Sequence, residues 1–158
     1  RVLDDNAHIL LRYACGARGM LWASQVAAGQ ENALRLRVYG ETGSLEWFQE
    51  NPNQLIHRPL GEPMRTLTRG GAGLSSDVAV GAITRIPAGH PEGFIEGFAT
   101  LYSDFADLIE STAVTGGVSA TASNQARLLP TVADGVKGVR FVGAAVESMA
   151  GGSIWVTL

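Results

Sequence analysis

The hydrophobic period of the chain changes at Gly89-His90-Pro91, and this change constrains the fold more than any other feature. Before it, short runs rich in β-formers are separated by Gly, Pro and Asn, which is typical of strands. After it, apolar residues recur at spacings of three and four, which is typical of amphipathic helices. Strands first and helices second predict an α+β fold rather than alternating β and α units.

The first part of the chain predicts five or six sequential strands with short links, an antiparallel meander. We expect a large open-faced antiparallel sheet, completed by a last strand at residues 153–158, with two main helices packed on one face. The expected strands of the meander cover residues 7–15, 18–27, 32–40, 44–50, 54–58 and 64–69.

The hairpin around Glu41-Thr42-Gly43 can be given a register on paper. If residue 39 pairs with residue 44, one face becomes apolar and the other charged, whereas a slip of one residue mixes the two. The four resulting pairs are Leu36–Trp47, Val38–Leu45, Arg37–Glu46 and Arg35–Phe48. The sequence therefore specifies this register well.

Two helices are expected downstream. The first begins at Pro91, which needs no N–H at a first helical position, and carries a stripe from Phe94 to Ile109. The second begins at Thr131 as N-cap, with Asp134 in the place of a capping-box acid. Its glycines, which lower helix propensity, suggest close packing on a neighbour; they are Gly135, Gly138 and Gly143. Residues 70–90 and 111–130 are expected to be loops.

Composition excludes several classes of function. The chain has 158 residues, 46% of them hydrophobic, which fits one domain over residues 1–158. A net charge of −3 argues against nucleic acid and anionic membrane as partners. A single cysteine, Cys15, allows no internal disulfide and favours the cytoplasm. The histidines have no metal-ligand spacing. Because the chain starts at Arg1 without Met, we expect that it belongs to a longer polypeptide.

The densest candidate site lies where the first helix begins. His90 and Glu92 are two residues apart there, and Arg85 precedes them by five. An imidazole can exchange protons near neutral pH, and a carboxylate can accept hydrogen bonds from two neighbouring hydroxyls. His90 and Glu92 could form an acid–base pair or bind neighbouring hydroxyls of a sugar, and Arg85 could reach the same pocket. Alternatively, Glu92 serves only the helix start, His90 lies in a solvated loop and Arg85 forms a surface pair.

Several motifs together resemble a known domain. They are GHPEGF at residues 89–94, FATLYSDF at 98–105, PTVADG at 130–135, GGSIWV at 151–156, GMLWASQ at 19–25 and LRVYGETGSLEW at 36–47. This pattern, which covers nearly the whole chain, resembles the C-terminal domain of the glucose–fructose oxidoreductase / inositol dehydrogenase / rhizopine-catabolism (Gfo/Idh/MocA) family.

The resemblance implies a parent enzyme that moves hydride between NAD or NADP and a sugar, inositol or related polyol. It also implies an N-terminal Rossmann domain, but this chain has neither the Gly-x-Gly-x-x-Gly fingerprint nor the family's Glu-Lys-Pro motif. We therefore expect no catalytic residue and no bound cofactor in this chain. Its expected partners are the parent's own Rossmann domain, a small polyol and a second copy of the chain.

The charged face of the 32–50 hairpin is the expected homodimer surface, because aromatic and charged side chains alternate there. Its residues are Arg35, Arg37, Glu46 and Phe48. Two other functions stay open at this point: a non-enzymatic module whose only role is association, and a self-contained carbohydrate-binding domain.

Overall fold

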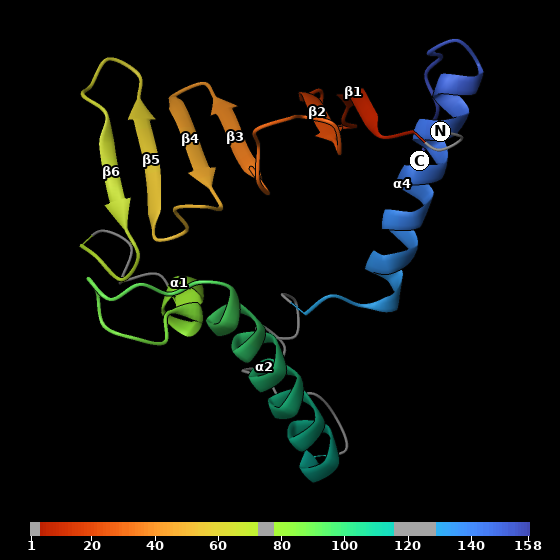
Figure 1. Cartoon of the computed structure of the whole chain (residues 1–158). Helices are drawn as coiled ribbons and strands as arrows, with labels where there is room; N and C mark the ends of the chain where they lie inside the picture. The colour runs from red at the N-terminus through yellow and green to blue at the C-terminus, as the bar shows by residue number, and fades with distance from the viewer. Residues whose placement is uncertain (1–3, 73–77, 116–128) are drawn as a thin grey trace. The chain divides into compact units, whose positions relative to one another are not determined.

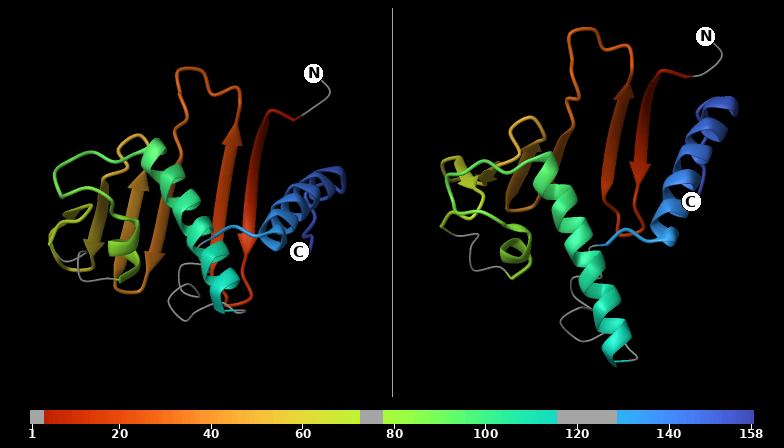
Figure 2. Two further views of the ribbon diagram at one scale, coloured as in Figure 1. Left: turned by 90° about the horizontal axis from the view of Figure 1, so that it is seen from below. Right: turned by 60° about the horizontal axis from the view of Figure 1, so that its bottom comes forward.

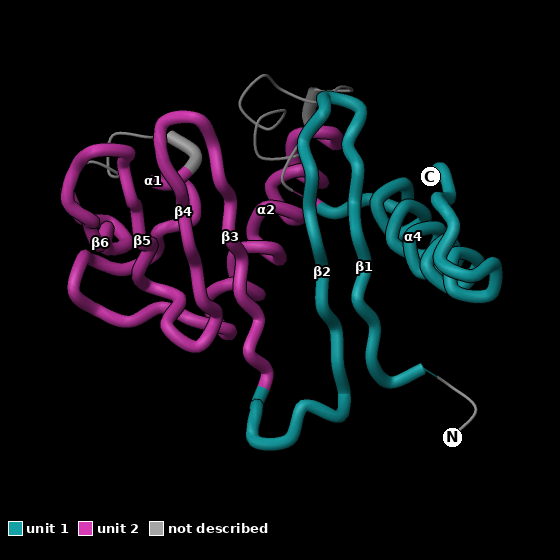
Figure 3. Tube along the Cα trace, turned by 90° about the horizontal axis from the view of Figure 1, so that it is seen from above, with its two compact units in different colours: residues 1–31, 130–158 teal, residues 32–129 magenta. Residues whose placement is uncertain are grey.

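The computed structural model describes residues 4–72, 78–115 and 129–158 (Figure 1). The chain divides into two compact units, which Figure 3 colours separately: residues 1–31 with 130–158, and residues 32–129. The described residues form two antiparallel sheets and three helices, so the predicted α+β class with antiparallel strands is confirmed.

The first unit consists of one long hairpin and one helix. Strands β1 (Asn6–Arg12) and β2 (Arg18–Ser24) pair antiparallel in a two-stranded sheet. Their turn is closed by a hydrogen bond from Tyr13 N to Ala17 O, 3.0 Å long. Helix α4 covers Val132–Ala150. The predicted cap is confirmed, because Thr131 Oγ1 accepts a hydrogen bond from Asp134 N and the Asp134 carboxylate accepts one from Thr131 N.

The second unit contains a four-stranded meander. Its strands are β3 (Arg35–Gly40), β4 (Gly43–Phe48), β5 (Gln54–Pro59) and β6 (Arg65–Thr68), paired in sequence order. The predicted register of β3 and β4 is confirmed at all four pairs. Trp47 faces Leu36 on the apolar side, half-buried, and its indole N–H donates to Pro52 O at 3.1 Å.

Two helices follow the meander in this unit. Helix α1 (Val78–Ile83) lies in a stretch that we expected to be a loop; the apolar run Val-Ala-Val suffices for one and a half turns. Helix α2 (Phe94–Thr115) is straight and unbroken in both views of Figure 2. It continues past the predicted end to Thr115, and the hydroxyls of Ser111 and Thr112 find an acceptor within the helix, Leu108 O. Most of the second expected loop, residues 116–128, lies outside the described residues.

The predicted last strand at residues 153–158 is wrong, because these residues pair with no strand in the described part of the chain. The segment instead doubles back on α4. Ser153 N donates to Ser148 O at 2.7 Å, and Ser148 Oγ donates to Ile154 O at 2.6 Å. Trp155 then meets β1 through its ring, with the Arg12 guanidinium 3.7 Å from the ring centroid.

Both long helices leave apolar side chains exposed. In α4, Val132 is 86% exposed and none of the residues is buried. A methyl group added at any of its three interior glycines would meet no atom within 4 Å, so the close packing that we inferred from them is not found. In α2, the stripe from Phe94 to Ile109 also stays open to solvent. None of the described helices has the length and apolar character that crossing a membrane requires.

Gly43 should be intolerant of any side chain. Its φ is +156°, and an added Cβ would lie 2.5 Å from Arg58 O of the neighbouring strand. We expect Gly43→Ala to lower the free energy of unfolding by about 2–3 kcal/mol, since both the backbone and β5 must shift. The matched control is Gly40→Ala in the same hairpin, whose Cβ would meet only Gly43 O at 3.7 Å. Urea unfolding followed by tryptophan fluorescence gives the free energy of unfolding of both variants. An equal decrease in the two would contradict the clash with Arg58 O as the cause.

Candidate functional site

The candidate site is the loop that leads from α1 into α2, residues 84–93. It contains a β-turn in which His90 N donates to Pro87 O at 3.2 Å. Gly89, the third residue of that turn, has φ +86°, which a type II turn requires and which glycine adopts without strain. His90 therefore leaves the turn exposed, and its imidazole makes no hydrogen bond with any described residue.

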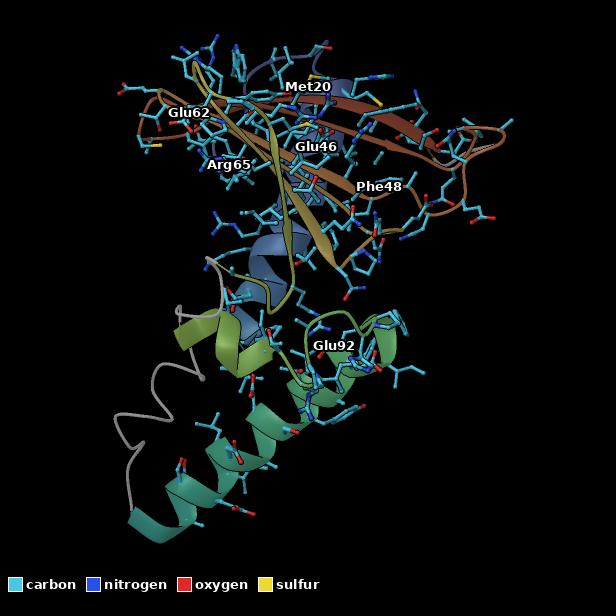
Figure 4. All side chains as sticks on the ribbon, turned by 90° about the vertical axis from the view of Figure 1, so that its left-hand side faces the viewer. Met20, Glu46, Phe48, Glu62, Arg65 and Glu92 are labelled. Carbon is cyan, nitrogen blue, oxygen red and sulfur yellow. The ribbon has the colours of Figure 1, made fainter. Side chains whose placement is uncertain are left out.

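Glu92 closes the base of this loop. It is one of two buried acidic residues in the described part of the chain, 8% exposed. One carboxylate oxygen, Oε1, accepts hydrogen bonds from Arg85 N and Ile86 N, both 2.6 Å long. The carboxylate thus joins the end of the loop to its beginning and satisfies two backbone donors as the chain leaves α1. Figure 4 labels Glu92 just before the start of α2.

Asn53, from the turn between β4 and β5, holds the backbone of Glu92. Its Oδ1 accepts from Glu92 N at 2.9 Å, and its Nδ2 donates to Glu92 O at 2.8 Å. One side-chain amide thus satisfies both polar groups of a single residue, in the manner of a neighbouring strand. This contact fixes the loop to the sheet of the same unit.

Arg69, just after β6, completes the network. Its Nη1 is 2.9 Å from Glu92 Oε1 and donates to Ile86 O at 3.1 Å. Its Nη2 donates to His90 O at 2.5 Å, and its Nε donates to Asn53 Oδ1 at 2.9 Å. The side chains of Arg69 and Glu92 are only 15% and 7% exposed. A planar fork with five donors can serve four acceptors at once, which a lysine ammonium cannot do.

The three predicted site residues have different surroundings. His90 and Glu92 lie on the same loop, as expected. The guanidinium of Arg85 instead contacts α2, with hydrogen bonds to Thr100 Oγ1, Ala99 O and Ser103 Oγ of 2.7 to 2.9 Å. Glu92 and Arg85 therefore have internal partners, whereas His90 does not. A role for the three in binding a substrate stays a prediction.

Asn53 and Arg69 were missed by the sequence analysis. No spacing connects them, because they lie 16 residues apart and are 39 and 23 residues from Glu92. The available signal was indirect. Asn53 directly precedes one predicted strand and Arg69 is the last residue of the next, and in an antiparallel pair the start of one strand lies beside the end of the other.

Helix α2 begins three residues later than predicted, at Phe94 rather than Pro91. Asn53 engages the backbone of Glu92, so the first helical hydrogen bond starts at Gly93 O, which accepts from Gly97 N at 3.0 Å. Glu96 then reaches back to accept from Gly93 N at 2.8 Å. This hydrogen bond is the main reason why the pKa of Glu96 is lowered.

The predicted dimer surface is a charged network on one face of the meander. Glu46, 8% exposed, lies 2.7 Å from Arg35 Nε and 2.8 Å from Arg58 Nη1. The hydrogen bond from Arg58 is the largest cause of the lowered pKa of Glu46, and the charges of Arg35 and Arg37 act in the same direction. The Arg35 guanidinium also lies 5.6 Å from the centre of the Phe48 ring. Figure 4 shows Glu46 and Phe48 on this sheet.

Two other observations bear on the chemistry of the site. A hollow of about 230 Å³ borders the loop, but the only polar side chain among its lining residues is that of Thr84, whose hydroxyl already donates to Val80 O at 2.7 Å. The lining residues are Gly70, Val80, Gly81, Thr84, Ile86, Pro87 and Ala88. Within the described residues, no group of His, Cys, Asp and Glu is arranged to hold a metal ion.

Glu92 should matter to stability far more than an exposed acid does. We expect Glu92→Ala to lower the free energy of unfolding by about 3 kcal/mol, because Arg69 loses its counter-charge and two N–H groups lose their acceptor. Glu62→Ala is the control: Glu62 is 54% exposed and pairs only with Arg65, so its loss should cost less than about 0.5 kcal/mol. Denaturant unfolding of both variants provides the comparison. Similar values for the two would show that Glu92 does not close the loop.

The chain is similar to several oxidoreductases, including an inositol dehydrogenase homolog. It is 36% identical over 154 residues to an uncharacterized oxidoreductase, YfiI, of Bacillus subtilis, which covers 98% of this chain and 38% of that protein. A solved oxidoreductase from Sinorhizobium meliloti is 45% identical, with a TM-score of 0.88 over 99% of this chain and 42% of its own. An inositol dehydrogenase homolog from Azotobacter vinelandii, solved with NADH and myo-inositol, is 38% identical, with a TM-score of 0.89 over 99% and 40%.

The chain thus spans about two fifths of the length of these relatives. The family described as "Oxidoreductase family, C-terminal alpha/beta domain" matches it over residues 1–158. This match takes in both compact units, the meander and the loop that Glu92 closes. The chain belongs to this family of oxidoreductase C-terminal domains.

Proposed function

We propose that this chain is the substrate-binding and oligomerisation domain of an NAD-dependent oxidoreductase that acts on the CH–OH group of inositol or a related polyol. The observation that carries the proposal is the 38% identity, over 99% of the chain, to an inositol dehydrogenase homolog solved with NADH and myo-inositol. The site adds a physical argument: the loop that Asn53, Arg69 and Glu92 hold presents to solvent an imidazole that makes no hydrogen bond with a described residue.

Polyol oxidation by a nicotinamide nucleotide needs one site for the nucleotide and one that orients the alcohol. The described residues do not fit the nucleotide, because their sheets are antiparallel, whereas a Rossmann nucleotide site is built on a mostly parallel sheet. The nucleotide site therefore belongs to another part of the parent protein in this proposal. That this chain alone binds no cofactor and is inactive stays a prediction.

His90 is the residue of this chain that we assign to the polyol. Its imidazole has one N–H donor and one acceptor when neutral, so it can bond a hydroxyl in either direction. The loop already satisfies the backbone of His90, through Pro87 O and Arg69, so contact with a ligand need not disturb the fold. Glu92 and Arg85 act in the proposal by holding this loop and by tying it to α2.

The parent protein gives the test of this assignment. We expect His90→Ala to raise KM for myo-inositol about tenfold, the loss of one hydrogen bond to a hydroxyl, with KM for NAD unchanged. Steady-state oxidation of myo-inositol, followed by NADH absorbance, gives both constants. The control is His57→Ala, a half-buried residue in the middle of β5. If the wild-type enzyme oxidises no polyol, or if His90→Ala behaves as the wild type does, the assignment fails.

The association of two copies through the charged face is the second element of the proposal. Arg35, Arg37, Glu46 and Phe48 share this face by their register, and the ion pair between Arg35 and Glu46 holds these two side chains in place. Aromatic residues and arginine are enriched at protein–protein interfaces, and two copies related by a two-fold axis would each present this same surface.

Phe48→Glu tests the dimer surface directly. The new carboxylate would meet a second copy across the two-fold axis, and burial of unpaired charge opposes association. We expect sedimentation velocity to show a shift from dimer to monomer, with circular dichroism unchanged. Leu60→Glu, at an exposed apolar residue beyond the end of β5, serves as the control and should leave the dimer intact. A dimer that survives Phe48→Glu would locate the contact on another surface.

A further inference from the structure

We propose that Arg69 is a positioning residue for polyol recognition, which fixes the orientation of His90 without contacting the substrate. This inference rests on the proposed function, since it assigns a residue that acts through His90. It concerns the buried network of Asn53, Arg69 and Glu92, whose members lie far apart in the sequence and converge on one loop.

The contacts of Arg69 cover the loop on both sides of the turn. Its guanidinium donates to Ile86 O, before the turn, and to His90 O, after it. The turn itself is closed by a single hydrogen bond from His90 N to Pro87 O. Arg69 therefore connects the segment before the turn with the segment after it, in addition to the hydrogen bond that closes the turn itself.

The same guanidinium also connects the loop to the sheet. Arg69 follows β6, and its own N–H donates to Asn53 O at 3.0 Å, so its backbone is held by the turn between β4 and β5. Its Nε and the amide N–H of Glu92 share Asn53 Oδ1 as acceptor, at 2.9 Å each. A displacement of Arg69 would thus release Glu92 and His90 together.

A purely structural function explains this network less well. The pair is buried, and a hydrophobic pair of similar volume could stabilise the loop equally. What a hydrophobic pair could not do is bind two carbonyl groups and one carboxylate at defined angles. Such orientation is what a site needs in order to hold a donor or acceptor within a fraction of an ångström of a hydroxyl group.

The test uses the parent dehydrogenase with myo-inositol and NAD as probes, and the variants Arg69→Lys and Arg69→Ala. We expect both to raise KM for myo-inositol by about tenfold or more, with KM for NAD unchanged, because the imidazole is no longer held in place. Arg69→Lys keeps the charge and is the milder change, so it reports on the fork geometry if Arg69→Ala folds poorly. Arg65→Ala is the matched control: an arginine on β6, the strand that Arg69 follows, 56% exposed and paired with Glu62.

Two further measurements separate positioning from general stability. Amide hydrogen exchange should become faster across residues 85–93 in both Arg69 variants, and should stay unchanged in β3 and β4. Added guanidinium ion should partly restore KM for myo-inositol in Arg69→Ala, whereas methylammonium should not. Rescue of this kind would not follow from a loss of stability alone.

The outcomes distinguish the two proposals. If His90→Ala raises KM for myo-inositol but the Arg69 variants do not, or if exchange across the loop stays slow in them, the positioning role of Arg69 is wrong and the proposed function stands. If His90→Ala has no effect, the proposed function fails, and a rise in KM in the Arg69 variants would then show that Arg69 does not act through His90.

Discussion

The ion pair between Arg69 and Glu92 determines the geometry of the loop before α2. The guanidinium and the carboxylate are 2.9 Å apart and largely shielded from water. Neither charge could be buried alone, because the desolvation of an unpaired ion costs several kcal/mol. Both must therefore keep their partners, and those partners are backbone groups of the loop before α2. The paired charges of Arg69 and Glu92 thus hold the loop before α2, which has no regular secondary structure, in one conformation.

The sequence predicts those parts of the fold that local chemistry decides. The register of β3 and β4 follows from alternation, since only one register separates Leu36 and Trp47 from Arg37 and Glu46. The capping box of α4 follows from Thr131 and Asp134, three residues apart, and the pKa of Asp134 falls to about 2 chiefly through its hydrogen bond with Thr131. Each feature involves neighbours along the chain or across one hairpin.

The features that the sequence does not predict involve distant residues or competing contacts. Helix α2 starts late because Asn53, from a distant turn, binds the backbone that would have formed its first turn. The last segment forms no strand because Ser148 and Arg12 hold it through side chains. His90 and Glu92 could be found from the sequence, but the different environments of the two, one exposed and one buried, depend on Arg69.

In the loop before α2, the residues that hold the backbone are not the residue that we propose to contact the ligand. The shape of the loop comes from main-chain carbonyls and amides held at the base by Asn53, Arg69 and Glu92, while the side chains of Ala88 and His90 at its apex take no part in these hydrogen bonds. Mutations at the apex can therefore accumulate at small cost to folding, provided that Gly89 keeps its turn. If His90 contacts the polyol as proposed, a change of one or two side chains at the apex would alter the alcohol that is bound and leave the backbone of the loop as it is.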